Sequence, residues 1–250
     1  MNTRKKIVIV GATSAIAEHC ARLWVQGSAV ELTLVARDMD RTERVAADLR
    51  VRSPHSEIRV LPAQFMDPLA IEALAEAIAA RGEIDTLLIA HGTLPEQGTC
   101  QGSLAACRAA LEINGISPVL FAEAFAKHME RAGHGTLAMI GSVAGDRGRK
   151  SNYVYGAAKG LMTRYAQGLQ HRFAGTRVKV VLIKPGPTDT PMTAHLKSAG
   201  AKLAPLEDVA RQIVDAIERG QALVYVPRKW RAIMWVIRHL PGAIFNKMNI

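Results

Sequence analysis

The amino-acid sequence predicts an α/β fold, a doubly wound parallel sheet of about seven strands with helices on both faces. Short runs of β-branched residues alternate with longer Ala-, Leu- and Glu-bearing segments of helical period, which is the pattern of right-handed βαβ units. The length of 250 residues, with 49% hydrophobic residues, suits one sizeable core. We therefore expect a single domain over residues 1–250, in which residues 228–250 form a basic amphipathic tail.

Seven β-branched runs are the expected strands, and about six helices separate them. In chain order the runs read KKIVIV, VELTLVA, EIRVLPA, IDTLLIA, GTLAMIG, RVKVVLI and ALVYV. Two longer interruptions, residues 94–102 and 184–205, each directly follow a run. Ligands of doubly wound sheets bind beyond the carboxyl ends of the strands, so both loops are expected at the mouth of a site.

Composition and charge predict a cytoplasmic protein. The chain has three cysteines, an odd number without metal-ligand spacing, which indicates reduced thiols and no metal site: Cys20, Cys100 and Cys107. The first apolar run, residues 7–10, is too short for a signal peptide, and no run reaches the roughly 18 consecutive apolar residues of a membrane span. The net charge of +10 does not predict nucleic-acid binding, because it is not interleaved with a recognisable reading motif.

The turn after the first strand is a candidate phosphate-binding loop. In GATSAIAEHC, Gly11 stands at the turn, and Ala15 and Ala17 stand where such a loop has its next two glycines. A phosphate needs a tight turn, a close backbone and the N-terminus of the following helix. Alanine at the second place adds a methyl group toward the ligand, so an ordinary strand-to-helix turn is the alternative.

Arg37 follows the second strand, at the place where a dinucleotide fold selects its cofactor. A carboxylate there suits the ribose 2′-hydroxyl of NAD, whereas an arginine suits the 2′-phosphate of NADP. Arg37 therefore favours NADP, and the neighbouring Asp38 leaves NAD as an alternative. A solvated surface arginine is the other interpretation.

The segment SNYVYGAAKG predicts a catalytic acid. Residues four apart share a helix face, so Tyr155 and Lys159 project together while Tyr153 points elsewhere. A nearby ammonium group is expected to stabilise the Tyr155 phenolate and to lower its pKa from about 10. Ser142, after the fifth strand, is placed to hold a substrate oxygen, and Asn114 to organise a water relay to Lys159. Taken singly, these residues also have ordinary explanations: the Tyr155 and Lys159 pair as an exposed helix surface, and Ser142 and Asn114 as turn residues.

Together these residues give the chain a resemblance, over nearly all its length, to the short-chain dehydrogenase/reductase family. That family has a glycine-rich turn, a catalytic Asn, a Ser, Tyr-x-x-x-Lys and Pro-Gly followed by Thr, in this order. The matching positions are Gly11, Asn114, Ser142, Tyr155, Lys159, Pro185, Gly186 and Thr190. The departures are Ala15, Ala17, Gln64 in place of an Asp that meets adenine, and Ala90-His91-Gly92 in place of Asn-Ala-Gly.

The resemblance implies a Rossmann fold, a homo-oligomer and an NAD(P)-dependent carbonyl reductase. Tyr155 would protonate the carbonyl oxygen, Lys159 would hold the nicotinamide ribose, Ser142 would steady the alkoxide and Thr190 would orient the carboxamide. The residues expected at the cofactor are Gly11, Thr13, Ser14, Ala15, Ile16, Arg37, Gln64, Phe65, Ala90, His91, Gly92, Tyr155, Lys159, Pro185, Gly186, Thr188 and Thr190.

Three further segments are similar to one branch of that family, the decaprenylphosphoryl-2-keto-pentose reductases. They read VAGDRGRKSNYVYGAAK, PMTAHLK and LVYVPRKWRAIMWVIRHLPGAIFNKMNI. This similarity implies a lipid-linked phosphosugar substrate and a partner oxidase. A reductase of another soluble or carrier-bound carbonyl, such as a 3-oxoacyl thioester, and a non-catalytic nucleotide-binding scaffold are the alternatives.

Two basic regions are expected to bind anions, one at a substrate phosphate and the other at a membrane surface. Arg147 and Arg149, between Ser142 and Tyr155, are expected to clamp a substrate phosphate, with a solvated charge run as the alternative. The tail, residues 228–250, has five cations, no acid and an apolar stripe with tryptophans. It is expected to dock on an anionic membrane surface and so to make the enzyme peripheral at the inner face of the cell membrane. Packing of the stripe on the protein's own core or on a partner subunit is the alternative.

Overall fold

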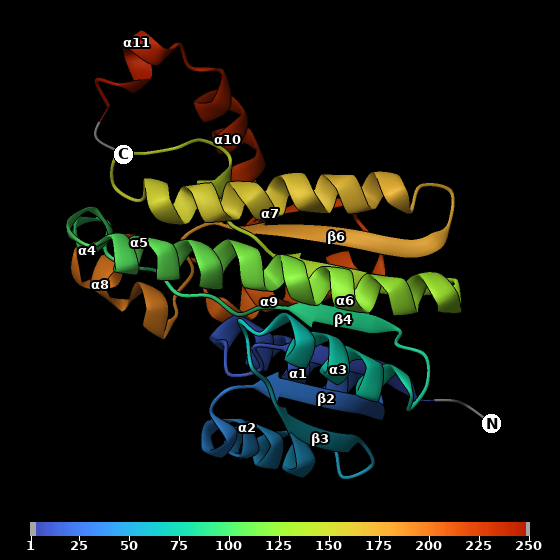
Figure 1. Ribbon diagram of the computed structural model, residues 1–250. Helices are drawn as coiled ribbons and strands as arrows, with labels where there is room; N and C mark the ends of the chain where they lie inside the picture. The colour runs from blue at the N-terminus through green and yellow to red at the C-terminus, as the bar shows by residue number, and fades with distance from the viewer. Residues whose placement is uncertain (1–3, 249–250) are drawn as a thin grey trace.

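The structure, a computed structural model, describes residues 4–248 and has a central sheet between two layers of helices (Figure 1). All seven predicted strands are present and pair in parallel, in the order β3-β2-β1-β4-β5-β6-β7. The direction of strand addition reverses between β1 and β4, which is where such sheets open a binding crevice. The strands are β1 Lys5–Val10, β2 Val30–Ala36, β3 Glu57–Pro62, β4 Thr86–Ile89, β5 His134–Ile140, β6 Arg177–Pro185 and β7 Leu223–Val226.

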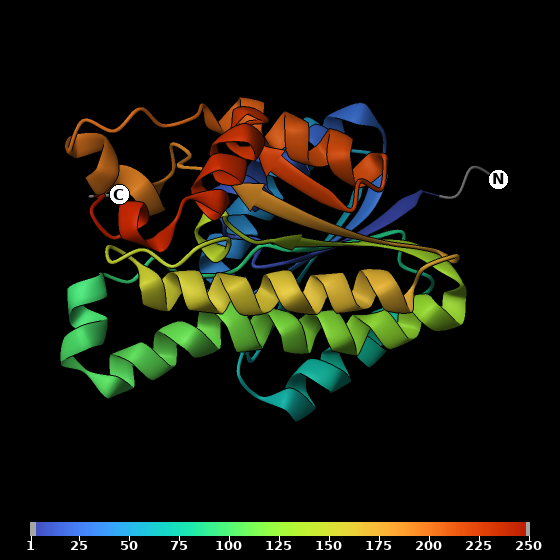
Figure 2. The same ribbon diagram turned by 90° about the horizontal axis from the view of Figure 1, so that it is seen from above.

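Helices cover both faces of the sheet, as Figure 2 shows from above. One face carries α1 (Ala15–Gly27), α2 (Met39–Arg52) and α9 (Leu206–Glu218), and the other carries α3 (Pro68–Ala79), α6 (Ser117–Ala132) and α7 (Tyr153–Arg172). The strands present Ile and Val to both layers, because a parallel sheet is buried on both sides. The shorter elements are α4 Gln97–Gly102, α5 Leu104–Leu111, α8 Ala194–Ser198, α10 Lys229–His239, α11 Gly242–Phe245, the π-helical turn η1 Glu112–Ile116 and the 3₁₀ turns η2 Val143–Gly145 and η3 Pro191–Thr193.

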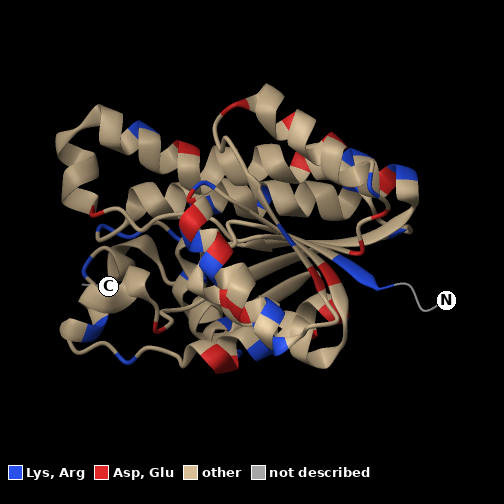
Figure 3. Cartoon of the chain, turned by 90° about the horizontal axis from the view of Figure 1, so that it is seen from below, with Lys and Arg blue, Asp and Glu red and all other residues tan. Residues whose placement is uncertain are grey.

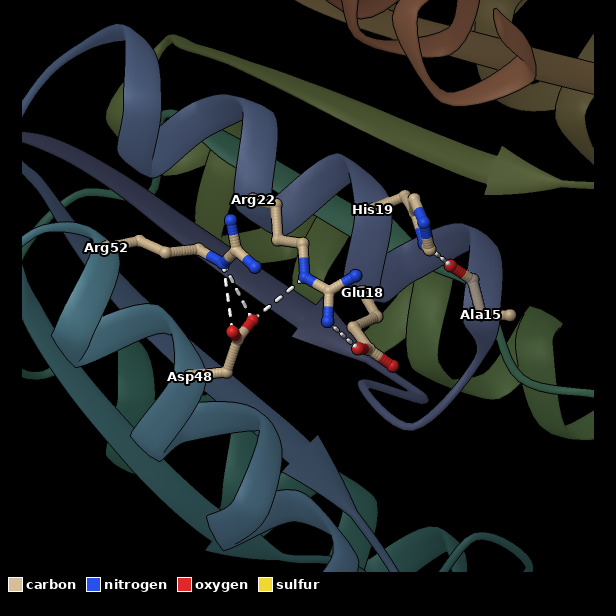
Figure 4. Close-up of polar contacts among 6 residues, drawn as sticks. All are labelled: Ala15, Glu18, His19, Arg22, Asp48 and Arg52. Carbon is tan, nitrogen blue, oxygen red and sulfur yellow. Dashed lines mark hydrogen bonds and ion pairs between the residues drawn. The ribbon is translucent and has the colours of Figure 1, made fainter. Parts of the chain in front are cut away.

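Ion pairs tie neighbouring helices together on the outside of the molecule. The Arg22 side chain of α1 donates to Asp48 of α2 at 2.8 Å and to Glu18 at 2.5 Å, and Arg52 donates to the same Asp48 carboxylate (Figure 4). Both signs of charge are interspersed along these outer helices (Figure 3). Such exposed pairs stabilise the fold by only about 0–1 kcal/mol each, so the core rather than the surface holds the layers together.

One continuous helical run, from α5 through η1 to α6, is long and apolar enough to cross a membrane by length and composition alone. In this structure the run covers the sheet instead. Phe121, Phe125 and Met129 are fully buried against β4 and β5, and Asn114 lies at the candidate site. Packing on the sheet therefore accounts for these apolar residues of α6, whereas Leu104 of α5 and Ile116 of η1 are 87% and 42% exposed.

Candidate active site

A continuous groove crosses the carboxyl ends of the strands at the reversal between β1 and β4. It consists of two adjoining cavities with common lining residues: Ser14, Ile16, Ala90, His91, Gly92, Thr190 and Met192. One end is lined by the turn after β1 and by Arg37, and the other by Ser142, Tyr155 and Lys159. The predicted cofactor and catalytic residues thus meet in one site, although Arg37 and Ser142, for example, are 105 residues apart in the sequence.

The turn after β1 has the geometry that a pyrophosphate requires. Gly11 has a φ of +85°, and a Cβ there would lie 2.5 Å from the backbone nitrogen of His91, so only glycine fits. Ser14 begins α1 without a side-chain cap, which leaves the first backbone N–H groups of the helix open to the groove. Ala15 lines the groove, whereas Ala17 is buried in the core and allows α1 to pack on α9.

The ribose end of the groove has two arginines. Arg37 lies with its guanidinium 5.7 Å from the centre of the Phe65 ring, and Arg41, in the first turn of α2, lines the same cavity. The Asp38 carboxylate accepts a hydrogen bond from the Arg41 backbone at 2.9 Å, because it caps α2. One oxygen of Asp38 thus caps α2, while the carboxylate and the two exposed guanidinium groups all line this end of the groove. Sequence reasoning missed Arg41, because Arg37 precedes the N-cap of α2 and helical spacing does not relate the two side chains.

Aromatic rings form the floor of the groove. His91 packs edge-on against Phe65 and Phe121, with ring centres 4.7 and 5.5 Å away, and its Nε2 lies 2.9 Å from the Ser117 hydroxyl. Loss of solvent, helped by the charges of Lys159 and Arg37, lowers the pKa of His91 to about 3. The ring is neutral at physiological pH. Gln64 is exposed and does not line the groove, so the predicted adenine contact has no support from its position.

The catalytic residues come from three elements that pack against each other at the other end of the groove. Tyr155 and Lys159 share one face of α7, Ser142 lies at the start of the loop after β5, and Asn114 lies in the π-helical turn η1. Asn114 is fully buried, accepts from the Thr93 backbone at 2.8 Å and donates to the Ala110 carbonyl at 2.9 Å. The widened turn is what lets η1 present this amide while the helix continues, as π-bulges at functional sites do.

The pKa of Tyr155 differs from the expectation that Lys159 lowers it. Burial raises the pKa of Tyr155 to about 12, although a hydrogen bond with Ser142 lowers it in part. Burial lowers the pKa of Lys159 to about 8, and its ammonium donates to the Ile140 carbonyl at 3.1 Å. The expected depression of the Tyr155 pKa by Lys159 is therefore absent, because desolvation outweighs the 5.8 Å contact between the ammonium and the Tyr155 ring.

The loop after β6 closes the groove from the other side. Pro185, Gly186, Thr188 and Thr190 all line it, as expected. Thr188 is buried and donates to the Gly186 carbonyl at 3.0 Å, and Thr190 begins η3 with a reciprocal cap to Thr193. The indole of Trp230, from α10, lies directly on Gly186, and a Cβ at Gly186 would overlap it. The C-terminal segment thus forms part of the wall behind the site.

The two arginines of the loop after β5 lie in different places. Arg149 lines the cavity beside Tyr155, its Nε is buried without a hydrogen-bond partner among residues 4–248, and burial lowers its pKa. Arg147 instead donates to the carbonyls of Ile237 and Leu240 at 2.6 and 2.7 Å. The expectation that Arg147 clamps a substrate phosphate is corrected by this geometry, since its guanidinium is already bound to the end of α10.

The substrate end has further lining residues that were not among the individually predicted site residues. Asn152, which precedes α7, has a buried Oδ1 without a partner among the described residues. The others come from the loops after β4, β5 and β6: Thr93, Leu94, Ile140, Gly141, Val143, Ala144, Pro187, Met192, Thr193 and Leu196. Most of them are apolar, so no pattern of chemistry-bearing side chains marks them in the sequence.

Comparisons with known proteins agree with this site. Residues 5–200 match the short chain dehydrogenase family. An uncharacterized oxidoreductase of Streptomyces coelicolor is 30% identical over 248 residues, which is 98% of this chain and 96% of that protein. An uncharacterized oxidoreductase of Mycobacterium tuberculosis is 31% identical over 245 residues, 97% of this chain and 96% of that protein.

Solved structures show the same fold. A crystal structure of an actinorhodin polyketide ketoreductase variant with NADPH superposes with a TM-score of 0.79 at 21% identity, over 89% of this chain and 95% of that one. The groove, the Tyr155 and Lys159 pair and the family match support one conclusion. The chain belongs to the short-chain dehydrogenase/reductase family and is an NAD(P)-dependent oxidoreductase.

Proposed function

We propose that the protein is an NADPH-dependent reductase that reduces the 2-keto group of a polyprenyl-phosphoryl pentose to give the arabinose epimer. It would work in the cytoplasm, as a homo-oligomer, beside an oxidase that supplies the ketone. The observation that carries the proposal is Arg149, a partly buried cation next to Tyr155 whose Nε has no partner among the described residues.

The protonation state of Tyr155 favours reduction. With a pKa raised to about 12, the phenol keeps its proton at neutral pH and can donate it to a carbonyl oxygen. Ser142, which is hydrogen-bonded to this phenol, would hold the same oxygen as it becomes an alkoxide. A bound NADPH would supply the hydride. Lys159 and Thr190 would hold its nicotinamide half; both line the groove, and the Lys159 ammonium donates a hydrogen bond to the Ile140 carbonyl.

Arg149 supplies the reason for a phosphorylated substrate. A guanidinium that loses water without gaining an acceptor is unfavourable, and a phosphate in the cavity would provide that acceptor in a bidentate geometry. Asn152 lies in the same lining and would face the sugar hydroxyls. The apolar side chains Leu94, Met192 and Leu196 would contact the first part of the lipid chain.

Arg37 and Arg41 support NADPH rather than NADH. The ribose 2′-phosphate carries about two negative charges, and two arginines at one end of the groove would neutralise it. Asp38, the residue that leaves NAD as an alternative cofactor, accepts from the Arg41 backbone through one oxygen and also lines this end of the groove.

A second candidate is the reduction of another carbonyl, soluble or carrier-bound, such as a 3-oxoacyl thioester. The apolar lining of the cavity favours it, because an acyl chain would pack on the same residues. It shares the catalytic residues and differs only in its use of Arg149.

The experiment measures kcat/KM with NADPH for three substrates: a polyprenyl-phospho-2-keto-pentose, a neutral ketone and a 3-oxoacyl thioester. Loss of absorbance from the reduced cofactor reports turnover. We expect the phospholipid-linked sugar to be the best substrate, and Arg149→Gln to lower its kcat/KM about 10- to 100-fold while sparing the neutral ketone.

Lys150→Gln is the matched control, because it removes an exposed cation from the same loop, and this cation does not line the cavity. If Arg149→Gln lowered kcat/KM equally for all three substrates, the proposed contact between Arg149 and a substrate phosphate would be wrong. Faster turnover of the thioester would replace the proposal by the second candidate, and no turnover of any carbonyl would favour a nucleotide-binding scaffold.

A further inference from the structure

Helix α10 has two apolar faces, and only one of them is buried. The inner face, formed by Trp230, Met234 and Ile237, packs on Val143 and Tyr225 next to the active site. Met234 is 1% exposed, like a residue of the main core. Core packing therefore accounts for the inner half of the apolar stripe and leaves the outer half unexplained.

The C-terminal segment is held firmly in this position. The Arg147 guanidinium binds the last carbonyls of α10 and stacks on the Phe245 ring of α11, with 3.8 Å to the ring centre. The adjacent Asp146 carboxylate accepts from the Tyr225 hydroxyl at 2.7 Å and pairs with the buried ammonium of Lys184. These contacts join α10 and α11 to the loop that carries Ser142 and Arg149, so the outer face has a fixed orientation relative to the site.

The outer face exposes large apolar side chains. Trp235 is 65% exposed and Val236 is 52% exposed on α10, and Ile244 is 53% exposed on α11. Trp235 stacks with His239, at 4.9 Å between ring centres, but with no core residue. Exposed tryptophan and aliphatic side chains on one short segment are costly in water unless a partner covers them.

The charge around these side chains is of one sign. No acidic residue follows Glu218 in the sequence, whereas Arg228, Lys229 and Arg231 are exposed on or beside α10. Among the described residues, ion pairs involve residues from Lys6 to Arg219, and none involves a cation of α10 or α11. The surface is thus complementary to something both apolar and anionic.

We propose that the outer face of α10 and α11 docks on an anionic lipid surface. Tryptophan, Val and Ile side chains would enter the headgroup boundary, and the unpaired cations would contact lipid phosphates. The contacts of Asp146 and Arg147 would then hold the substrate end of the groove close to the membrane. This inference depends on the surface alone and not on the identity of the substrate.

The test uses the full chain and vesicles of phosphatidylcholine, with and without about one third phosphatidylglycerol, since the anionic lipid supplies the surface potential. We expect cosedimentation with the anionic vesicles at low salt, and weak binding to the zwitterionic ones. Replacing Arg228, Lys229 and Arg231 by Gln should weaken partitioning about a hundredfold, from roughly fivefold per cation.

Fluorescence quenching tests the position of Trp235. Vesicles with brominated lipid chains should quench the tryptophan fluorescence of the wild type. Trp235→Phe should abolish that quenching, because Trp24 and Trp230 pack inside the protein, away from the outer face.

Matched controls remove the same kinds of side chain elsewhere. The apolar test variant is Trp235→Ser with Val236→Ser, and its control is Val51→Ser on α2, where Val51 is 83% exposed. The control for the charge variant replaces three exposed arginines outside α10 and α11 by Gln: Arg44, Arg131 and Arg177. Equal losses in the control variants, or no wild-type binding to anionic vesicles at low salt, would overturn the proposal. A dimer that the Trp235 and Val236 variant converts into a monomer, without vesicle binding by the wild type, would make this face an interface between copies.

Discussion

The two ends of the groove are assembled in different ways. The cofactor end is built mostly from turns that directly follow β1, β2, β3 and β4, and Ile113 of η1 and residues 190–192 after β6 complete it. The substrate end combines the loop after β5, the start of α7, the loop after β6 and the back support of α10. The cofactor end thus depends mainly on short segments next to strands, whereas the substrate end depends on contacts between segments up to about 90 residues apart.

The largest effect should come from the point where the two ends meet. Tyr155→Phe removes the proton donor and should lower kcat by about 10²- to 10⁴-fold in a steady-state reductase assay. Tyr153→Phe is the control on the same helix, because its hydroxyl is exposed and accepts only a 3.3 Å hydrogen bond from Gln101. Similar losses for both tyrosines would contradict the assignment of Tyr155.

The cofactor end should respond to charge. Arg37→Ala together with Arg41→Ala should raise the KM for NADPH about 10- to 100-fold and leave the KM for NADH almost unchanged, because only NADPH has the 2′-phosphate. Parallel titrations with the two reduced cofactors provide the comparison. If the KM values rise alike, the arginines are surface groups and the enzyme does not select NADPH through them.

The buried ammonium between the two ends should limit stability. Lys159 is 3% exposed and its pKa falls from 10.5 to about 8, so the unfolded chain binds the extra proton between these values. Stability should therefore rise with pH from about 8 to about 10, which thermal unfolding can follow. Lys159→Met should be more stable at pH 7 by about 1–3 kcal/mol and inactive, and should lose this rise with pH. A rise that persists in the variant would have to come from another group.

The smallest expected effect concerns the support behind the substrate end. Arg147→Gln removes two hydrogen bonds to the end of α10 and the stacking on Phe245. The loss should lower the free energy of local opening by about 1–3 kcal/mol. Hydrogen exchange of residues 229–245 should accelerate, while that of β1 and α1 should not. Unchanged exchange in α10 would mean that the inner apolar face alone holds it.

The sequence predicted more of the cofactor end than of the substrate end for physical reasons. β-branched runs and helical period revealed all seven strands, and the position of Gly11 after a strand indicated the turn. Helical spacing placed Tyr155 and Lys159 on one face, but burial, which sets their pKa values, depends on the packing of α7 and was not predictable from spacing. Arg147 and Arg149 look equivalent in the sequence, and only the position of α10 separates their roles.

The contact of Trp230 with Gly186 also bears on the order in which the site forms during synthesis. The lining of the cofactor end is complete once Met192 has been made, whereas Trp230 comes near the end of the chain. The wall behind Pro185 and Gly186 is therefore completed only after nearly all of the protein has been made. A nascent chain can form its nucleotide crevice before it has a finished substrate chamber.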